Sequence, residues 1–152
     1  ANHLYMVGSM GCASSLGLGL GLARPDLKVV IIDGDGAALM RMGNFSTIGA
    51  YGGNNIIHIL LDNGVHDSTG AQATVSANVH FARIASACGY SLSYEGNDPE
   101  LLDDLLAPVT PGPRFAHLKI RPGTIDNLPR PAITPDQVLV RLMQHIGSRH
   151  ML

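Results

Sequence analysis

Two aliphatic stretches of the chain each end in an acidic, glycine-containing loop, and this repeated arrangement constrains the fold more than any other feature. Val29–Ile32 leads into Asp33-Gly34-Asp35-Gly36, and Ile56–Leu61 leads into residues 62–67, whose sequence is Asp-Asn-Gly-Val-His-Asp. Runs of this length and composition predict buried strands. Between the two loops, residues 37–51 carry apolar side chains at helical spacing. Strands that alternate with helices in this way predict a doubly wound, mainly parallel sheet.

The rest of the chain continues the alternation and completes an α/β prediction. Strands are predicted at residues 4–7, 28–33, 56–61, 91–94 and 114–120, and helices at 12–23, 37–51, 78–88, from 98 to the prolines between 108 and 113, and 135–146. Asn78 and Asp98 stand where helix caps are expected. The polar segment 63–77 is long enough to be functional. We therefore expect a three-layer α/β sandwich in one domain that spans residues 1–152.

The composition excludes several classes of function. Of the 152 residues, 45% are hydrophobic and 14% are charged, and the formal net charge is −2. We expect no nucleic-acid partner, because proteins that bind nucleic acid cluster Lys and Arg. No apolar run reaches the length of a membrane span, and no secretory signal precedes Val7. Cys12 and Cys88 fit no metal-binding spacing and predict reduced thiols in a cytoplasmic protein. The few charges and 18 glycines predict surfaces buried against other chains, and hence an oligomer.

The two acidic loops together predict a site for Mg²⁺ and a diphosphate. Because the carboxyl ends of parallel strands lie at one edge of a sheet, we expect the loops to meet there. Mg²⁺ takes few protein ligands, all oxygen, and completes its octahedron with phosphate and water oxygens. Asp35, the Asn63 side chain and a carbonyl such as that of Val65 provide such a set. The helix predicted after Gly36 would present backbone N–H groups to the phosphates.

Two other phosphate-binding motifs, the dinucleotide fingerprint and the P-loop, are excluded by the sequence. Gly17, Gly19 and Gly21 fall inside the helix predicted at 12–23, whereas the glycines of a dinucleotide fingerprint occupy the turn between strand and helix. We interpret these three as packing glycines. The sequence contains no Gly-Lys-Ser/Thr P-loop. Asn54-Asn55 precedes its strand and therefore does not contribute the asparagine ligand of the predicted Mg²⁺ site.

The sequence Gly34-Asp35-Gly36, a spacer of 26 residues (37–62) and Asn63 resemble the signature of thiamine diphosphate (TPP)-dependent enzymes, in their diphosphate-binding domain. The resemblance covers essentially the whole chain and implies the TPP-binding fold. It implies that Asp35, Asn63 and the main-chain carbonyl of Val65 are ligands of Mg²⁺. The cofactor-binding residues that it implies are Gly8, Ser9 and Met10, in the loop whose large apolar residue supports the bent cofactor, and Gly34, Gly36, Ala37, Val65 and His66.

The residues that follow the predicted Mg²⁺ ligands Asn63 and Val65 are the catalytic candidates of this chain. His66 and Asp67 follow Asn63 closely and stand where contact with the diphosphate or the substrate is expected. His66 is equally consistent with a solvated loop residue. His58 and His117 alternate within predicted strands, and we interpret both as core residues.

Further segments narrow the resemblance. Residues 5–11, 61–70 and 117–123 are similar to those of the phosphonopyruvate decarboxylases, and so is the proline-rich tail at 127–135. The sulfopyruvate decarboxylases share most of these features. The resemblance implies a carboxy-lyase that needs TPP and Mg²⁺ and decarboxylates an anionic three-carbon α-keto acid, with phosphonopyruvate giving phosphonoacetaldehyde and CO₂. The alternatives are a sulfopyruvate decarboxylase subunit and a subunit that binds TPP without turnover.

Enzymes of this family activate the cofactor with a glutamate that a separate pyrimidine-binding domain carries. This chain has only two glutamates, Glu95 and Glu100, on either side of the turn at 96–99, and neither stands in a suitable context. The sequence also opens with Ala-Asn-His rather than Met. We therefore expect the pyrimidine-binding domain in a preceding segment or on a partner subunit, in a homo- or hetero-oligomer. The chain alone is expected to be inactive.

Overall fold

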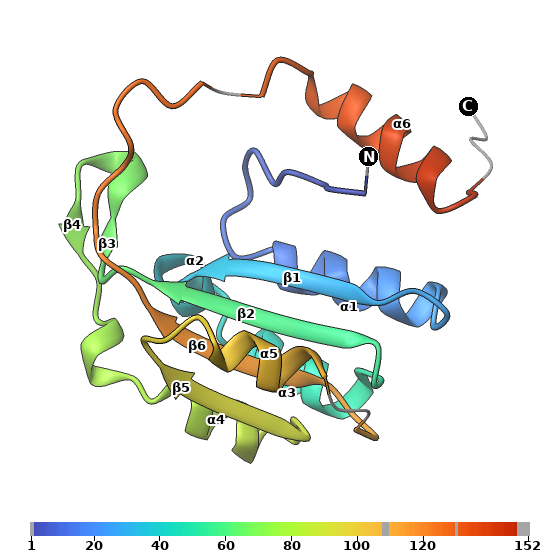
Figure 1. The fold of residues 1–152 in the computed structure, drawn as a ribbon, viewed down its shortest axis with the longest axis horizontal. Helices are drawn as coiled ribbons and strands as arrows, with labels where there is room; N and C mark the ends of the chain where they lie inside the picture. The colour runs from blue at the N-terminus through green and yellow to red at the C-terminus, as the bar shows by residue number, and fades with distance from the viewer. Residues whose placement is uncertain (1, 108–109, 130, 149–152) are drawn as a thin grey trace. The chain divides into compact units, whose positions relative to one another are not determined.

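The structure is a computed structural model that describes residues 2–107, 110–129 and 131–148. The chain forms two compact units, each of which is described by itself. The larger unit comprises Met10–Gly123, and the smaller one combines Ala1–Ser9 with Thr124–Leu152. Figure 1 shows the ribbon with its elements labelled. Both acidic loops belong to the larger unit.

The larger unit is built on a four-stranded sheet in which all strands run parallel. In spatial order the strands are β1 (Val29–Gly34), β2 (Ile56–Asp62), β6 (Arg114–Lys119) and β5 (Leu92–Gly96). Every residue of β2 except the half-buried Leu61 is buried, as its mainly aliphatic sequence predicts, and the buried residues include His58 and Asp62. The register pairs Gly34 of β1 with Leu61 of β2. The carboxyl ends of β1 and β2 therefore lie side by side at one edge of the sheet (Figure 1).

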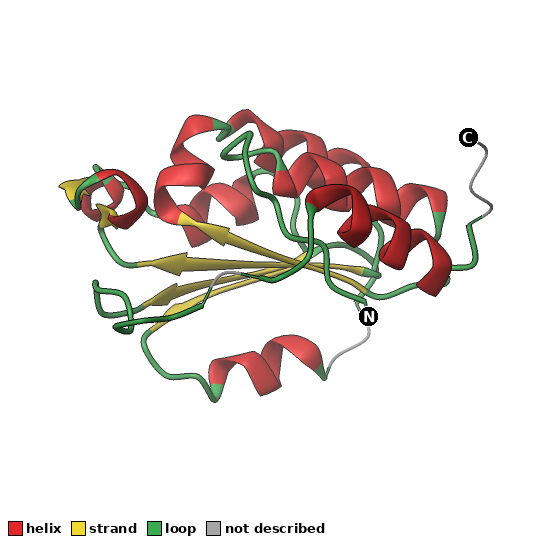
Figure 2. Cartoon of the chain, turned by 90° about the horizontal axis from the view of Figure 1, so that it is seen from above, coloured by secondary structure: helices red, strands yellow, loops and turns green. Residues whose placement is uncertain are grey.

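Helices cover both faces of this sheet, which Figure 2 shows edge-on. On one face lie α1 (Ala13–Ala23), α3 (Gly43–Tyr51) and α4 (Phe81–Ala87), and on the other lies α5 (Leu101–Leu106). The short helix α2 (Asp35–Met40) follows β1 directly at the carboxyl edge. A parallel sheet between two helical layers confirms the predicted α/β sandwich. None of the helices in the described ranges is long and apolar enough to span a bilayer.

Each face of the sheet has its own hydrophobic core. On the face covered by α3 and α4, the Phe45 side chain is 1% exposed. Its ring contacts those of Phe81, Phe115, Tyr90 and His58, with centroid distances between 5.3 and 6.3 Å. The opposite face packs aliphatic side chains of α5 against β2 and β6. Phe45 therefore lies at the centre of the larger, aromatic core.

Two of the three glycines within α1 let this helix approach the sheet closely. A Cβ atom on Gly17 would overlap the side chain of Ile31, and one on Gly21 would overlap that of Ile56. A Cβ on Gly19 would meet nothing within 4 Å. The interpretation as packing glycines is confirmed for Gly17 and Gly21 and is wrong for Gly19, which faces away from the sheet.

The smaller unit contains one helix, α6 (Pro135–His145), in its described part. The helix begins with a capping box, in which the Thr134 backbone N–H donates to the Gln137 side chain at 3.0 Å. Arg141 ties the helix to the N-terminal segment, because its Nη2 donates to the His3 carbonyl at 3.0 Å. The helix predicted at 135–146 is confirmed.

Two predicted elements differ in the structure. Residues 4–7 form no strand, since a strand needs hydrogen-bonded neighbours and no described strand pairs with them. The helix predicted at 37–51 is two helices, α2 and α3, separated at Arg41 and Met42. Arg41 leaves helical geometry with a φ of −133°. Its side-chain stem packs beside Gly11, where a Cβ would lie 2.5 Å from Arg41 Cγ. The helix that follows β1 is therefore much shorter than predicted.

The polar segment after β2 is more ordered than the predicted loop. Its elements are the antiparallel strands β3 (Val65–His66) and β4 (Gln72–Ala73) and the 3₁₀ turns η1 (Asp67–Thr69) and η2 (Ser76–Asn78). Asn78 ends η2 instead of capping a helix, and α4 begins only at Phe81. Asp98 does accept the Glu100 N–H, at 3.0 Å, before α5. The predicted end of that helix at Pro108 lies outside the described residues.

Candidate functional site

The two acidic loops meet at the carboxyl edge of the sheet. Asp35 opens α2 immediately after β1, and Asn63 follows the last residue of β2. Thr74 bridges the two loops. Its hydroxyl donates to Asp35 Oδ2 at 2.5 Å, and its backbone N–H donates to the Gly64 carbonyl at 2.8 Å. The parallel register of β1 and β2 thus brings the predicted ligand residues into one place.

Asp35 is a buried carboxylate that has no positive partner among the described residues. The residue is 2% exposed, and the Thr74 hydroxyl donates to it. Within the described ranges, no Lys, Arg or His nitrogen lies within 4.0 Å of its carboxylate. Burying a carboxylate is costly unless a cation compensates its charge. The surroundings of Asp35 therefore fit a bound divalent cation.

Hydrogen bonds fix the orientation of the Asn63 amide. Its Nδ2 donates to Asp67 Oδ2 at 2.8 Å, and its Oδ1 accepts the Val65 N–H at 3.2 Å. The Gly123 N–H also donates to Asp67 Oδ2, at 3.3 Å. Since an amide oxygen has two lone pairs, Asn63 Oδ1 keeps acceptor capacity for a metal ion. Asp67 thus orients a predicted ligand, a role that its place in the sequence did not reveal.

The oxygen donors at this edge suit Mg²⁺ better than a transition metal. A carboxylate from Asp35, an amide oxygen from Asn63 and a main-chain carbonyl such as that of Val65 are all hard ligands. In the part of the chain that the structure describes, no group of three or more His, Cys, Asp or Glu side chains is arranged to hold a metal ion. That these residues bind Mg²⁺ stays a prediction, and the donor chemistry fits it.

His66 packs against Gly36 in the first turn of α2. A Cβ on Gly36 would overlap the imidazole Cε1 and lie 2.5 Å from Nδ1. The absence of a side chain at this position therefore makes room for the ring. A Cβ on Gly34 would meet nothing within 4 Å, and Ala37 is half-buried. These four predicted cofactor-binding residues lie at or next to the same edge of the sheet, and cofactor binding itself stays a prediction.

The third predicted loop, 8–11, is divided between the two units. Gly8 and Ser9 belong to the smaller unit, and Met10, 42% exposed, belongs to the larger one. Gly11 adopts a φ of 88°, which favours glycine. Its carbonyl accepts a hydrogen bond from Asn44 Nδ2 at 3.2 Å. Met10 therefore precedes an anchored turn and keeps an accessible side chain.

Two buried histidines lie beside acids at the ends of strands. His58 Nε2 is 3.5 Å from Asp33 Oδ2, and His117 Nε2 is 2.8 Å from Asp62 Oδ2. Both histidines are 1% exposed, so the prediction that they belong to the core is confirmed. His58 also lies 3.2 Å from the Tyr90 hydroxyl, and burial raises the pKa of that hydroxyl. Sequence alone did not reveal these polar pairs, because each acid and its histidine come from different strands.

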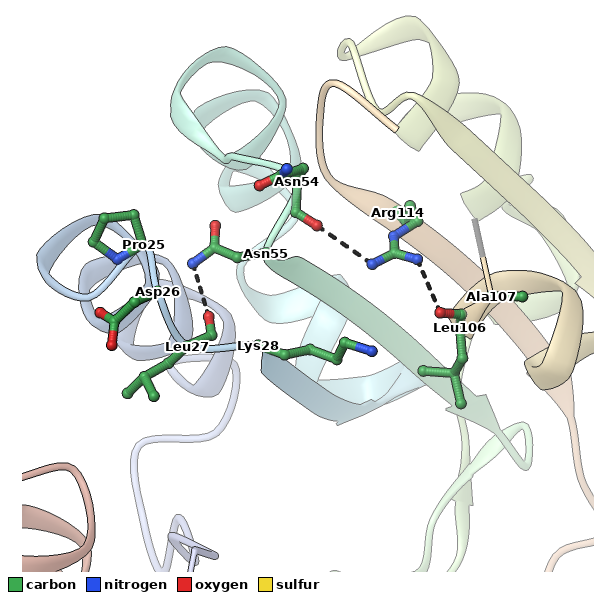
Figure 3. A pocket seen from close by; sticks show the side chains of 9 residues that line it. All are labelled: Pro25, Asp26, Leu27, Lys28, Asn54, Asn55, Leu106, Ala107 and Arg114. Carbon is green, nitrogen blue, oxygen red and sulfur yellow. Dashed lines mark hydrogen bonds between the residues drawn. The ribbon is translucent and has the colours of Figure 1, made fainter. Parts of the chain in front are cut away.

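The pocket drawn in Figure 3 lies at the opposite, amino end of the sheet and contains none of the predicted site residues. Its volume is about 240 Å³, and its lining residues are Pro25, Asp26, Leu27, Lys28, Asn54, Asn55, Leu106, Ala107 and Arg114. Arg114 donates to the carbonyls of Leu106 and Asn54, both at 3.3 Å. Asn55 Nδ2 donates to the Leu27 carbonyl at 3.0 Å. These polar groups join neighbouring elements, so the pocket is not the candidate site.

Comparison with known proteins shows the family. Residues 2–120 match the model of the family described as thiamine pyrophosphate enzyme, C-terminal TPP binding domain. The chain is 48% identical over 148 residues to a phosphonopyruvate decarboxylase of Streptomyces viridochromogenes. This alignment covers 96% of this chain and 37% of that protein. It is 35% identical over 144 residues to the sulfopyruvate decarboxylase subunit beta of Methanothermobacter thermautotrophicus. That alignment covers 95% of this chain and 75% of the subunit.

The matches also define how much of each relative the chain represents. A second phosphonopyruvate decarboxylase, from Streptomyces hygroscopicus, is 46% identical over 93% of this chain and 36% of its own length. The chain thus spans little more than a third of these two relatives. A suspected thiamin diphosphate-dependent enzyme from Mycobacterium smegmatis superimposes with a TM-score of 0.58 at 20% identity, over 76% of this chain and 23% of that one, a likeness of fold alone. The chain belongs to the thiamine pyrophosphate enzyme family, whose C-terminal TPP-binding domain it matches over most of its length.

Proposed function

We propose that this chain forms the diphosphate-binding half of the active site of a TPP- and Mg²⁺-dependent carboxy-lyase. The observation that carries the proposal is the buried Asp35 carboxylate, which has no cationic partner in the described ranges and is joined through Thr74 to the loop of Asn63. The substrate we propose is phosphonopyruvate, converted to phosphonoacetaldehyde and CO₂. Identities of 48% and 46% to two phosphonopyruvate decarboxylases support that choice.

The contribution of this chain to the reaction is to hold and orient. Asp35, Asn63 Oδ1 and the Val65 carbonyl would bind Mg²⁺ between them, and the metal would bind the diphosphate. Thr74 fixes Asp35, and Asp67 fixes the Asn63 amide, through the hydrogen bonds at 2.5 and 2.8 Å. Bound TPP would supply the electron sink that decarboxylation of an α-keto acid requires.

Further residues are assigned to the cofactor as part of the same proposal. Met10 would support the cofactor from an anchored turn, and its side chain is 42% exposed and accessible for that contact. His66, packed on Gly36, would face the diphosphate or the substrate. Gly8 and Ser9 would complete the loop that precedes Met10.

The activating glutamate has to come from outside this chain, on a pyrimidine-binding domain or subunit. Glu95 Oε1 lies 3.4 Å from Lys119 Nζ, and Glu100 stands at the N-cap of α5. The relative from Methanothermobacter thermautotrophicus is named as a beta subunit, which supports an assembly of this kind. We place the assembled enzyme in the cytoplasm, which the free thiols of Cys12 and Cys88 support.

A CO₂-release assay on the full-length protein with its pyrimidine-binding partner tests this function. We expect release from phosphonopyruvate only when both TPP and Mg²⁺ are present. Faster CO₂ release from sulfopyruvate would instead assign the second candidate function, that of a sulfopyruvate decarboxylase subunit. The 35% identity to such a subunit, over 75% of its length, favours this candidate. No release from either substrate by protein that binds TPP would contradict a catalytic role.

A further inference from the structure

One carboxylate joins both ends of the segment that follows β2. Asp62 Oδ1 accepts the Gly64 N–H at 2.9 Å and the Ser76 hydroxyl at 2.8 Å. Asp62 Oδ2 lies 2.8 Å from His117 Nε2. The three side chains involved, those of Asp62, Ser76 and His117, are 7%, 5% and 1% exposed. Residues 63–75, called the metal loop below, thus begin and end at the same buried acid.

We propose that Asp62 is a positioning residue that clamps the metal loop closed, with His117 fixing the orientation of its carboxylate. The proposal rests on the proposed function, because it concerns how the predicted Mg²⁺ ligands are held. Asp62 itself would not touch the metal. Its effect would reach the ligands through the two ends of the loop.

The connection from Asp62 to the predicted ligands is continuous. Ser76, held by Asp62, donates its backbone N–H to Thr74 Oγ1 at 3.3 Å, and the Thr74 hydroxyl donates to Asp35 Oδ2. At the other end, Gly64 lies between Asn63 and Val65 and is held by the same carboxylate. Releasing Asp62 therefore frees both ends of the loop at once.

His117 is placed to support the acid and not the loop. It comes from β6, where it pairs in register with Leu60, two residues before Asp62. The ring packs edge-on against Phe81 at 5.2 Å, and its Nδ1 lies 3.7 Å from Glu95 Oε2. These contacts hold the imidazole in place under the Asp62 carboxylate.

The neighbouring strand repeats the acid–histidine arrangement, but among the described residues no loop donates a hydrogen bond to its acid, Asp33. His58 of β2 pairs in register with Ile31, two residues before Asp33. The closest nitrogen–oxygen distance of that pair is 3.5 Å, compared with 2.8 Å for Asp62 and His117. The Asp62 carboxylate thus differs from its neighbour in binding the ends of a loop, which is the basis for assigning it a role in the site.

The test measures loop opening and metal affinity in the full-length protein. In Ser76→Ala, which removes one charge-assisted hydrogen bond, hydrogen exchange of the metal loop without TPP and Mg²⁺ is expected to accelerate about tenfold. Asp62→Ala removes the acceptor for both ends of the loop and should accelerate the exchange at least as much. The half-saturating Mg²⁺ concentration for TPP binding should rise about as much, with kcat at saturation unchanged. His117→Leu should act in the same direction, and His117→Gln, whose amide can donate to Asp62, should restore the parent behaviour.

Matched controls separate the clamp from general destabilisation. Asp98 makes the same turn contact, accepting the Glu100 N–H at 3.0 Å, but is exposed and distant from the loop in sequence. The Ser93 hydroxyl is buried and has no hydrogen-bond partner among the described residues. Asp98→Ala and Ser93→Ala should therefore leave loop exchange and Mg²⁺ affinity unchanged.

The outcomes distinguish the clamp from the function on which it rests. If Asp62→Ala and Ser76→Ala behave like their two controls, or if exchange accelerates equally in every strand, the clamp is refuted. Asp35→Ala tests the function independently. If Asp35→Ala loses Mg²⁺-dependent TPP binding while the clamp variants bind as the parent does, only the clamp is refuted. If Asp35→Ala binds Mg²⁺ with unchanged affinity, the proposed function itself is overturned.

Discussion

Replacing Gly36 by Ala tests the contact between α2 and the metal loop, because the effect is expected to change sign with the residue at position 66. The new methyl group would overlap Cε1 of His66 and lie 2.5 Å from Nδ1, so the imidazole has to move. An extra methyl forced into filled space costs about 1–3 kcal/mol. The same change in an unobstructed helix stabilises by about 1 kcal/mol. Gly36→Ala alone should therefore lower the free energy of unfolding by about 1 kcal/mol, the steric cost less the helix gain.

In a His66→Ala background the same substitution should stabilise the protein by about 0.5–1 kcal/mol, because no other atom then lies within 3.5 Å of the new methyl. Denaturant unfolding of the parent, both single variants and the double variant gives the coupling energy, which we expect to be about 2 kcal/mol. Gly43→Ala, at the first residue of α3 where a Cβ meets nothing within 4 Å, is the matched control. A coupling energy near zero would refute the packing of His66 on Gly36.

Three further predictions concern the packing and the helix ends. Gly49→Ala should lower the free energy of unfolding by about 3 kcal/mol, because the new Cβ would overlap the Cys88 carbonyl oxygen and lie 2.6 Å from the carbonyl carbon. An unchanged denaturation midpoint would contradict this prediction. Phe45→Ala should lower the free energy of unfolding by about 3–5 kcal/mol, because the Phe45 side chain is 1% exposed. A loss below about 1 kcal/mol in the same unfolding assay would show a loosely packed core. The Thr134 hydroxyl holds the pKa of Asp136 below its usual value. This carboxylate therefore stabilises α6 above its unfolded pKa, and the contribution is lost as the pH falls below about 4. Protection of α6 from hydrogen exchange should fall over that range in the parent but not in Asp136→Asn, and equal pH profiles would count against the assignment.

The sequence predicted the sheet and the meeting of its loops because both follow from strand physics. A strand buried on both faces is mainly aliphatic, as β2 is apart from His58 and Asp62, and such a run is recognisable without tertiary information. Parallel pairing of β1 with β2 then places Asp35 beside the loop that begins at Asn63. The break at Arg41 was not predictable in the same way. The apolar spacing continues across it, and Arg41 packs there beside Gly11, which is distant in the chain.

The residues that support the site were invisible in the sequence for a related reason. Thr74 and Ser76 lie in a polar segment where hydroxyl side chains are common, and neither type nor spacing marks them. Their roles depend on hydrogen bonds to Asp35 and Asp62, which belong to other elements. The position of His117 in the sequence predicts a core residue, and its 1% exposure confirms that prediction. Only the register of β6 with β2 shows that it also supports an acid at the edge of the site.

The central claim is that Asp35 binds TPP through Mg²⁺. Titration calorimetry of the full-length protein with TPP, in the presence and absence of Mg²⁺, tests it directly. The parent protein and Asp98→Asn, altered at an exposed carboxylate before α5, should both bind TPP in a Mg²⁺-dependent manner. Asp35→Ala should lose that dependence together with its affinity for TPP. An unchanged TPP affinity in correctly folded Asp35→Ala would contradict the account.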